Sequence, residues 1–282
     1  MTQARLMDGT ALARRIVEDT AKKAADLTAR TGTAPCLATV LVGEDPASLT
    51  YVRMKRNRCR QAGMESRHVA LPAATTTAEL VGTLRELSAD PGVHGILLQH
   101  PVGDHVDERA AFEAIAPEKD VDGVTFASFA TMSFGLPGFV SCTPGGILRL
   151  LDEYGVDPAG KRAVVVGRSA ILGKPVGMLL LARDATVTYC RSRTRDLSAA
   201  VREADILVAA VGRPRLIRGQ DVKPGAVVID AGYSPGNVGD VDFDSAVERA
   251  SLITPVPGGV GPMTIATLLE QTADAAARQL GA

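Results

Sequence analysis

The side chains of Tyr51 and Lys55 have the types and the spacing that a reactive site needs. Asp45 can cap a helix in this segment, Pro46 suits its first position and Gly63 can end it. On such a helix Tyr51 and Lys55 share one face, because residues i and i+4 are neighbours on a helix surface. That face continues into small and apolar residues. We therefore expect Lys55 to be partly desolvated, and the arginines around it to form a solvated face.

Two later segments end in polar side chains of the kind that a ligand site uses. The apolar segment GILLQHP includes Gln99 at its end, and PEKDVDG supplies Asp120 and Asp122 beside a glycine. Ligands of open α/β sheets bind beyond the carboxyl ends of strands, which makes Gln99 a candidate site residue. Each segment also has a plain structural interpretation, since a glutamine at a strand end can be a satisfied polar group and Asp-Gly is a common turn.

A nucleotide site is indicated around Gly167. The segment KRAVVVGRSAILGKPVGMLLL predicts a strand, a tight turn and a helix, the arrangement that places a pyrophosphate at a helix N-terminus. The usual G-x-G-x-x-G pattern is not present here, because Ser169 stands where the second glycine would be and the next glycine is Gly173. The alternative is that these glycines serve only a tight turn.

The end of the next predicted strand, at Cys190, indicates which cofactor binds. An NAD enzyme carries an acidic residue there, about 20 residues past the glycine loop, to bind the ribose 2′-hydroxyl. This chain has Arg191, Ser192 and Arg193 instead. A guanidinium can bind a 2′-phosphate through two hydrogen bonds, and Arg168 could reach the same group, so we expect NADP. The alternative is that these arginines only solvate a loop. The expected cofactor-binding residues are Gly167, Arg168, Ser169, Gly173, Arg191 and Ser192.

The elements that must position these residues are those of an α/β protein. Apolar runs rich in valine and isoleucine have the continuous hydrophobicity of strands buried on both faces of a parallel sheet. They cover residues 36–43, 93–99, 162–167, 185–190, 205–212 and 226–232. Helix-length segments alternate with them, at 76–89, 144–154, 173–183 and 196–204. We expect a domain boundary in the irregular stretch 124–142, and a last amphipathic helix with Pro262 at its first position.

The composition excludes several classes of protein. At 282 residues and 46% hydrophobic, the chain can bury the cores of two domains. A formal net charge of -1 gives no electrostatic case for a nucleic-acid partner. No segment approaches the roughly 20 apolar residues that a membrane span requires, and the N-terminus lacks a signal peptide. The four cysteines are scattered without metal-ligand or disulfide spacing, so we expect no metal and a cytoplasmic protein.

Taken together, the motifs resemble the bifunctional methylenetetrahydrofolate dehydrogenase/cyclohydrolase family over nearly the full length. The resemblance rests on nine segments in order: ASLTYVRMKRNRCRQAGM, GILLQHP, PEKDVDG, CTPGGI, GKRAVVVGRSAILGKPVG, ATVTYC, ADILVAAVG, KPGAVVIDAG and PVPGGVGPMT. It implies a folate-binding catalytic domain of residues 1–140 plus 262–282, to which the last helix returns. It also implies a Rossmann-like NADP-binding domain of residues 141–261, a substrate cleft between the domains, and a homodimer.

The resemblance also implies roles for the candidate residues in one-carbon metabolism, which feeds purine biosynthesis. Tyr51 would stack on the tetrahydrofolate substrate, and Lys55 would be the central catalytic residue. Gln99 would hydrogen-bond that lysine, Asp122 would hold the donor edge of the pterin, and the loop ending at Pro262 would line the cleft.

The implied chemistry sets a requirement for Lys55. Oxidation of 5,10-methylenetetrahydrofolate to the methenyl cation transfers a hydride to NADP and removes no proton, so positioning suffices. Hydrolysis to 10-formyltetrahydrofolate needs a proton acceptor. We therefore expect the pKa of Lys55 to be lowered, in a desolvated site beside Gln99.

The sequence departs from the family pattern at places that keep two alternatives open. His100 stands where leucine is usual, Ser128 and Ala130 stand near the places of an asparagine and a glycine, and Arg191 stands where histidine is usual. One alternative is a monofunctional NADP-dependent dehydrogenase that acts on a folate or a modified pterin. The other is a catalytically silent, folate-binding paralogue, although a silent copy has no need for a partly buried lysine.

Overall fold

The computed structural model describes residues 3–43 and 57–282, which form two compact units. Unit 1 is drawn from Met1–Ala13, Met132–Pro137 and Ser141–Thr264, and unit 2 from Arg14–Thr131, Gly138–Val140 and Ile265–Ala282. Two helices, α1 (Gly9–Thr31) and α10 (Val260–Gln279), begin in unit 1 and end in unit 2. The chain therefore passes between the units along continuous helices.

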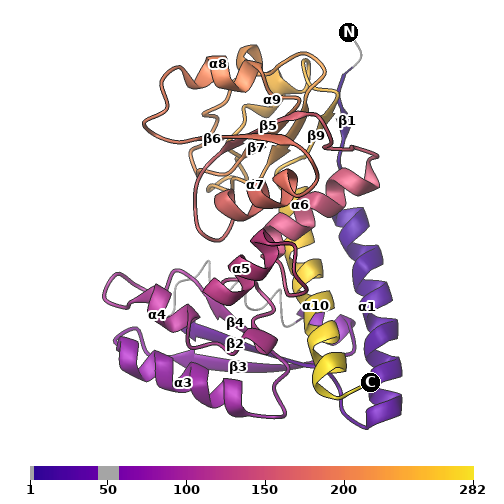
Figure 1. Ribbon diagram of the computed structural model, residues 1–282, viewed down its shortest axis with the longest axis vertical. Helices are drawn as coiled ribbons and strands as arrows, with labels where there is room; N and C mark the ends of the chain where they lie inside the picture. The colour runs from indigo at the N-terminus through magenta and orange to yellow at the C-terminus, as the bar shows by residue number, and fades with distance from the viewer. Residues whose placement is uncertain (1–2, 44–56) are drawn as a thin grey trace. The chain divides into compact units, whose positions relative to one another are not determined.

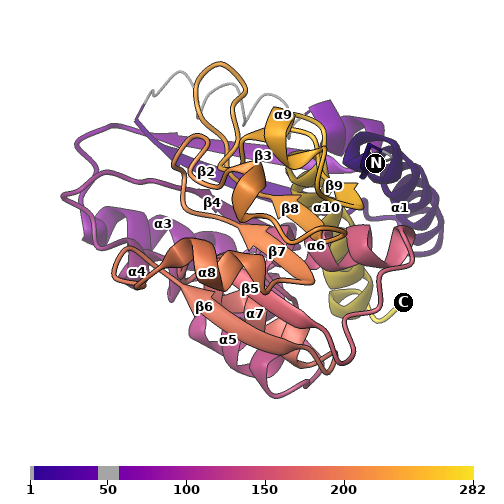
Figure 2. The same ribbon diagram turned by 90° about the horizontal axis from the view of Figure 1, so that it is seen from above.

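Unit 1 contains a parallel sheet of six strands. The strands are β1 (Arg5–Leu6), β5 (Arg162–Val166), β6 (Thr186–Cys190), β7 (Ile206–Ala209), β8 (Val227–Asp230) and β9 (Leu252–Ile253). Their spatial order is β1-β9-β8-β7-β5-β6, most of which can be followed in Figure 2. The chain goes from β5 to β6 on one side and then crosses back to β7 on the other. The neighbouring strands β5 and β7 thus form a topological switch point, where doubly wound folds bind their ligands.

Helices cover both faces of this sheet, which explains the continuous apolar strands. They are α6 (Cys142–Glu153), α7 (Gly173–Leu181), α8 (Leu197–Arg202) and α9 (Phe243–Ala246). Figure 1 shows α6 and α7 on one face and α8 and α9 on the other. Val164 and Val166 of β5 pack into a core with Val201 of α8 and Ala246 of α9. The alternate residues, Ala163 and Val165, are also fully buried.

Unit 2 contains a three-stranded parallel sheet in the order β3-β2-β4. Its strands are β2 (Cys36–Val42), β3 (Glu65–Leu71) and β4 (Gly95–Gln99). The helices that it contains or begins include α3 (Thr77–Ala89), α4 (Glu108–Phe112) and α5 (Phe126–Ser133). The helix α3 starts with a capping box, in which the Thr76 side chain accepts from Glu79 N–H and the Glu79 side chain accepts from Thr76 N–H.

The last helix returns to unit 2, as the resemblance to the family implied. Gln271 of α10 donates hydrogen bonds to the carbonyls of Val121 (2.8 Å) and Val140 (2.9 Å), and accepts one from Val140 N–H (3.1 Å). Lys23 of α1 pairs with Glu270 of α10 at 3.5 Å. These contacts hold residues from three separate parts of the sequence in one unit.

Most predicted elements are present, with differences that have physical reasons. The strand β3 was missed because it is a half-exposed edge strand with the sequence ESRHVAL, whereas β1 and β9 are too short for a pattern. The helix α5 lies inside the stretch 124–142 that we expected to be irregular. The helix α10 begins at Val260, so Pro262 is its third residue and not its first. In the described part of the chain, each helix is too short or too polar to cross a membrane.

Candidate functional site

The predicted cofactor residues of unit 1 meet at the carboxyl ends of β5 and β6. These strands pair in parallel with Val166 opposite Cys190, so Gly167 and Arg191 leave the sheet side by side. The Gly167 N–H donates to the Cys190 carbonyl at 3.0 Å. The side chains of Arg168, Ser169, Arg191, Ser192 and Arg193 are all exposed at this edge.

The loop that starts at Gly167 is tight because its backbone approaches other backbone. Gly167 has a φ of +141°, and a Cβ there would lie 2.3 Å from the carbonyl oxygen of Ala210. A Cβ on Gly173 would lie 2.6 Å from the carbonyl carbon of Gly167. Both positions require glycine, one for packing against the end of β7 and the other for packing the helix against its own loop.

Ser169 takes over a structural task in this modified loop. Its Oγ accepts hydrogen bonds from the N–H groups of Leu172 (3.2 Å) and Gly173 (3.1 Å), at the start of α7. Two of the donors that begin a helix are thereby satisfied by a side chain. The loop therefore closes without a second glycine, while the Ser169 hydroxyl proton can still donate to a ligand.

The donor set at this edge fits the 2′-phosphate of NADP better than the hydroxyl of NAD. Arg168, Arg191 and Arg193 bring three guanidinium groups to the ends of β5 and β6, and residues 191–195 contain no carboxylate. The next acidic side chain, Asp196, accepts a hydrogen bond from Ala199 N–H at 2.9 Å and so caps α8. A phosphate would meet cationic donors here without a competing anion.

In unit 2, Gln99 lies at the position that the sequence predicted, at the carboxyl end of β4. It is half-buried, and its side-chain Nε2 donates to the His100 carbonyl at 2.9 Å. The His100 ring packs edge-on against Phe112, with centroids 6.4 Å apart and planes at 73°. One side of the His100 ring is therefore occupied by packing.

The two aspartates of PEKDVDG have different surroundings. Asp120 is fully buried, and its carboxylate accepts hydrogen bonds from Thr125 N–H (2.9 Å), Val124 N–H (3.0 Å) and Ser128 Oγ (2.6 Å). Asp120 thus folds the loop that leads into α5, and Ser128 completes its hydrogen bonding. Asp122 is half-buried, which leaves it the more accessible carboxylate for a substrate.

Tyr51 and Lys55 lie outside the described residues, and the structure describes only the segment that follows them. Residues 57–61 are helical, and Gly63 has a φ of +65°, the conformation that commonly ends a helix. Cys59 and Ala62 are fully buried and Arg60 is exposed. The buried face and the solvated arginine agree with the pattern read from the sequence for this segment.

The structure adds residues that the sequence analysis did not single out. Tyr233 follows β8 at the carboxyl ends of the strands and has 55% of its surface exposed. Asp230 ends β8, and both it and Asp240 are buried. A carboxylate at the end of the apolar run 226–232 was the available signal for Asp230. The sequence gives no such signal for Asp240, because Asp240 lies in a loop.

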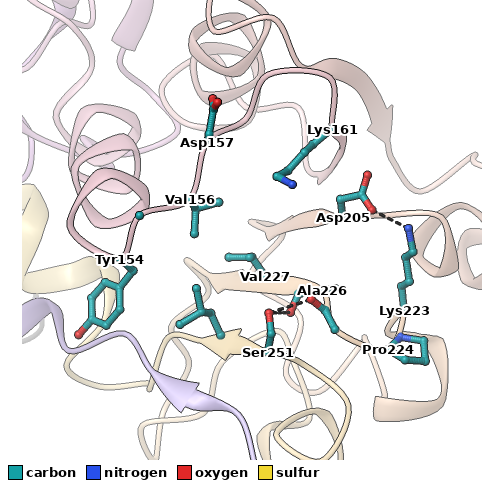
Figure 3. Close-up of a pocket in the computed structure, with 13 residues that line it drawn as sticks. Tyr154, Val156, Asp157, Lys161, Asp205, Lys223, Pro224, Ala226, Val227 and Ser251 are labelled. Carbon is teal, nitrogen blue, oxygen red and sulfur yellow. Dashed lines mark hydrogen bonds and ion pairs between the residues drawn. The ribbon is translucent and has the colours of Figure 1, made fainter.

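A hollow in unit 1, of about 390 Å³, lies at the end of the sheet opposite to the predicted cofactor residues (Figure 3). It lies beside the amino ends of β5, β7, β8 and β9, and none of the predicted site residues lines it. Lys161 points into it, and Lys223 pairs with Asp205 at 2.5 Å. In parallel sheets the ligands bind at the carboxyl edge, so this hollow is separate from the cofactor edge.

The switch point, the glycine loop and the arginines at one carboxyl edge define a Rossmann-type, nicotinamide-nucleotide-dependent dehydrogenase. Comparison with known families is more specific. Residues 7–122 match the family model "Tetrahydrofolate dehydrogenase/cyclohydrolase, catalytic domain", and residues 141–280 match "Tetrahydrofolate dehydrogenase/cyclohydrolase, NAD(P)-binding domain". The chain belongs to the tetrahydrofolate dehydrogenase/cyclohydrolase family.

Individual relatives agree with this assignment over the full length. The chain is 80% identical over 278 residues to "Bifunctional protein FolD 1" of Streptomyces avermitilis, with 99% of this chain and 97% of that protein covered. It is 56% identical over 280 residues to "Bifunctional protein FolD" of Shouchella clausii, covering 99% and 100%.

Solved structures show the same fold. The bifunctional FolD methylenetetrahydrofolate dehydrogenase/cyclohydrolase of Campylobacter jejuni has a TM-score of 0.95 at 42% identity, covering 98% of this chain and 99% of that one. The Trypanosoma brucei methylenetetrahydrofolate dehydrogenase-cyclohydrolase, solved with NADP and an inhibitor, has a TM-score of 0.95 at 39% identity, covering 100% of each chain. The predicted family, the two-domain α/β fold and the enzyme class are confirmed, and neither alternative function is favoured.

Proposed function

We propose that this protein oxidises 5,10-methylenetetrahydrofolate to 5,10-methenyltetrahydrofolate with NADP+, and hydrolyses the product to 10-formyltetrahydrofolate. The observation that carries the choice of cofactor is the parallel pairing of Val166 with Cys190, which sets Arg191 beside Gly167. Family membership supports the folate substrate, and the NADP bound in the Trypanosoma brucei relative supports the cofactor.

We assign folate binding to residues 1–140 plus 262–282 and NADP binding to residues 141–261, with Pro262 lining the substrate site. The catalytic-domain match over residues 7–122 and the nucleotide-binding match over residues 141–280 support this division. We also propose a cytoplasmic location, and a homodimer because the resemblance to the family implies one.

The first step needs orientation and no acid or base. NADP+, when bound, supplies the acceptor for the hydride that leaves the methylene carbon. The product cation is stabilised by the two nitrogens that flank this carbon, so no proton has to be removed. Tyr51 stacks on the folate and Asp122 binds the donor edge of the pterin, and together they hold the carbon in place.

The second step needs a base. Water adds to the methenyl carbon and gives up one proton to the neutral amine of Lys55. The added hydroxyl then gives up its remaining proton as the C–O double bond forms and the bond from this carbon to N5 breaks. N5 takes up that proton, which leaves the formyl group on N10. Gln99 positions the lysine amine. The Gln99 amide nitrogen donates to His100, so the carbonyl oxygen is the end of the side chain that suits an amine donor.

Turnover of the purified protein tests this function. We expect NADPH to form from 5,10-methylenetetrahydrofolate and NADP+ with little accumulation of the methenyl compound, both followed by absorbance. Lys55→Met should remove the hydrolytic step, whereas Arg60→Met, which removes an exposed cation a few residues away, should not. Full hydrolysis by Lys55→Met would reject the role of Lys55, and the lack of turnover by the unmodified protein would reject the function.

A further inference from the structure

Asp240 binds three successive backbone N–H groups of the loop that follows β7. Its Oδ2 accepts from Val211 (2.6 Å) and Gly212 (3.0 Å), and its Oδ1 accepts from Arg213 (2.7 Å). The side chain is fully buried, although Asp240 lies 27 to 29 residues from these partners in the sequence. One carboxylate thus satisfies the donors of a turn that leaves the sheet.

Asp230, the last residue of β8, holds Asp240 in turn. Its Oδ1 accepts from the N–H groups of Gly232 (2.9 Å) and Asp240 (3.0 Å), and its Oδ2 accepts from Val241 (2.9 Å). Asp230 is 4% exposed. The two carboxylates therefore form a relay from the strand β8, through the backbone of Asp240, to the loop 211–213.

Two glycines show how closely this relay is packed. A Cβ on Gly232 would lie 2.3 Å from Cγ of Asp240, and a Cβ on Gly239 would lie 2.0 Å from Oδ2 of Asp230. Any larger side chain at either position would displace a carboxylate. Burying two neighbouring carboxylates is costly, and here their described partners are neutral N–H groups and not cations. Apolar side chains would avoid this cost, so we expect the two buried carboxylates to have a function beyond filling the core.

The loop that Asp240 binds lies beside the switch point between β5 and β7. The strand β7 pairs with β5, and the close contact between Gly167 and Ala210 brings the two following loops together. The adenosine half of a dinucleotide lies toward β6, where Arg191 stands, and the other half lies toward β7 and β8. Residues 211–213 are thus next to the half that carries the nicotinamide.

We propose that Asp240, held by Asp230, is a positioning residue for the nicotinamide half of NADP+, because it fixes the loop Val211–Arg213 before the cofactor binds. The proposal rests on the proposed NADP-dependent function. Gly212 has a φ of +64° and Arg215 a φ of +53°. Glycine adopts such a conformation freely, but a non-glycine residue such as Arg215 keeps it only where the surroundings hold it, and Arg215 N–H donates to the Gly239 carbonyl at 3.0 Å.

Binding measurements with two ligands test the proposal. Asp240→Asn replaces one of the two acceptor oxygens by an NH₂ group that faces backbone donors, so at least one of the three N–H groups of the loop loses its acceptor. We expect the Kd of NADP+ to rise at least tenfold, while the Kd of adenosine 2′,5′-bisphosphate, which contains only the adenosine half, changes less than twofold. Titration calorimetry gives both values. The amides of residues 211–213 should also exchange hydrogen faster in the variant without any ligand.

Asp242→Asn is the matched control, since Asp242 lies in the same segment and its carboxylate accepts from Ser245 Oγ at 2.6 Å. It should leave both affinities unchanged. If Asp240→Asn does not fold, Gly212→Ala strains the same loop without a clash, because no atom lies within 4 Å of the added Cβ. The same selective loss of NADP+ affinity is then expected.

Three results would overturn the proposal. One is equal loss of both ligands, which would mean that Asp240 only stabilises the domain. Another is unchanged NADP+ affinity with faster exchange of residues 211–213, which would mean that loop order does not matter for the cofactor. The third is failure of the unmodified protein to bind either ligand, which rejects the proposed function itself and is thereby distinguished from failure of the Asp240 role alone.

Discussion

Gly167 N–H donates to the Cys190 carbonyl at 3.0 Å, so the glycine loop and the segment that begins with Arg191 leave the sheet together. The phosphate-binding turn and the arginines are thus set in register by the backbone of two paired strands. This relationship explains how residues more than twenty positions apart can meet the same half of a dinucleotide.

Replacing Arg191 by alanine should reduce the preference for NADP+ over NAD+. A charge-assisted hydrogen bond to phosphate contributes about 1.5–3 kcal/mol, so kcat/KM for NADP+ should fall by about 10- to 150-fold. The value for NAD+ should change little, because NAD+ has no 2′-phosphate. Steady-state assays with both cofactors measure the ratio.

Arg162→Ala is the control for this charge change. Arg162 starts β5 at the amino end, pairs with Glu203 at 2.7 Å, and is exposed. It should leave the cofactor ratio unchanged. An equal fall for NADP+ and NAD+ in Arg191→Ala would show that Arg191 does not bind the 2′-phosphate.

Replacing Ser169 by alanine should destabilise unit 1. The Ser169 hydroxyl accepts from Leu172 and Gly173 N–H at the start of α7. Loss of a side-chain acceptor at the start of a helix costs about 1 kcal/mol. Urea unfolding followed by circular dichroism measures the change, with Ser192→Ala as a control on an exposed serine of the same edge. Equal stability of the two variants would mean that the Ser169 bonds contribute nothing to the fold.

Features that could be predicted from the sequence have a physical basis different from that of the features that could not. The core strands β5, β7 and β8 were predicted because both of their faces are buried, so their hydrophobicity is continuous. The edge strand β3 has no such signal. Ser169 at the start of α7 accepts hydrogen bonds from backbone N–H groups, and so do the carboxylates of Asp230 and Asp240. Every sequence supplies such N–H groups. Their partners were therefore not predictable from residue types.

Asp230 should make the protein more stable as the pH falls toward 4.5, opposite to the usual effect of an aspartate. Burial raises its pKa to about 6, against the lowering effect of its three N–H bonds, and the neighbouring Asp240 charge adds to the increase. The folded state then binds a proton more tightly than the unfolded state, whose aspartate titrates near 3.8. Stability from this group is present at low pH and is lost as the pH rises through about 6.

The comparison of wild type with Asp230→Asn isolates this effect. Between pH 7.5 and 4.5, the wild type should gain about 2 kcal/mol of unfolding free energy relative to the variant. Chemical unfolding at several pH values measures the difference. A difference that does not change with pH would mean that Asp230 is ionised throughout, with its N–H bonds outweighing burial.

His94, in unit 2, should make the protein less stable as the pH falls, which is opposite to the effect of Asp230. It is 1% exposed, and its Nδ1 accepts from Cys36 N–H at 3.1 Å. Burial lowers the pKa of its imidazole, and the positive charge of Lys119 lowers it further. Lys119 is itself fixed by a hydrogen bond to the Asp90 carbonyl at 2.6 Å.

Because the unfolded imidazole takes up a proton near pH 6.5 and the folded one resists it, His94 should destabilise the protein as the pH falls below about 6.5. The loss can reach about 1.4 kcal/mol per pH unit, the limit for one proton. In His94→Asn the amide oxygen can replace Nδ1 as the acceptor for Cys36, but it does not titrate. Unfolding free energies measured from pH 7.5 to 5 should therefore fall less steeply in His94→Asn than in the wild type. Parallel curves for the two proteins would show that His94 does not resist protonation in the folded state.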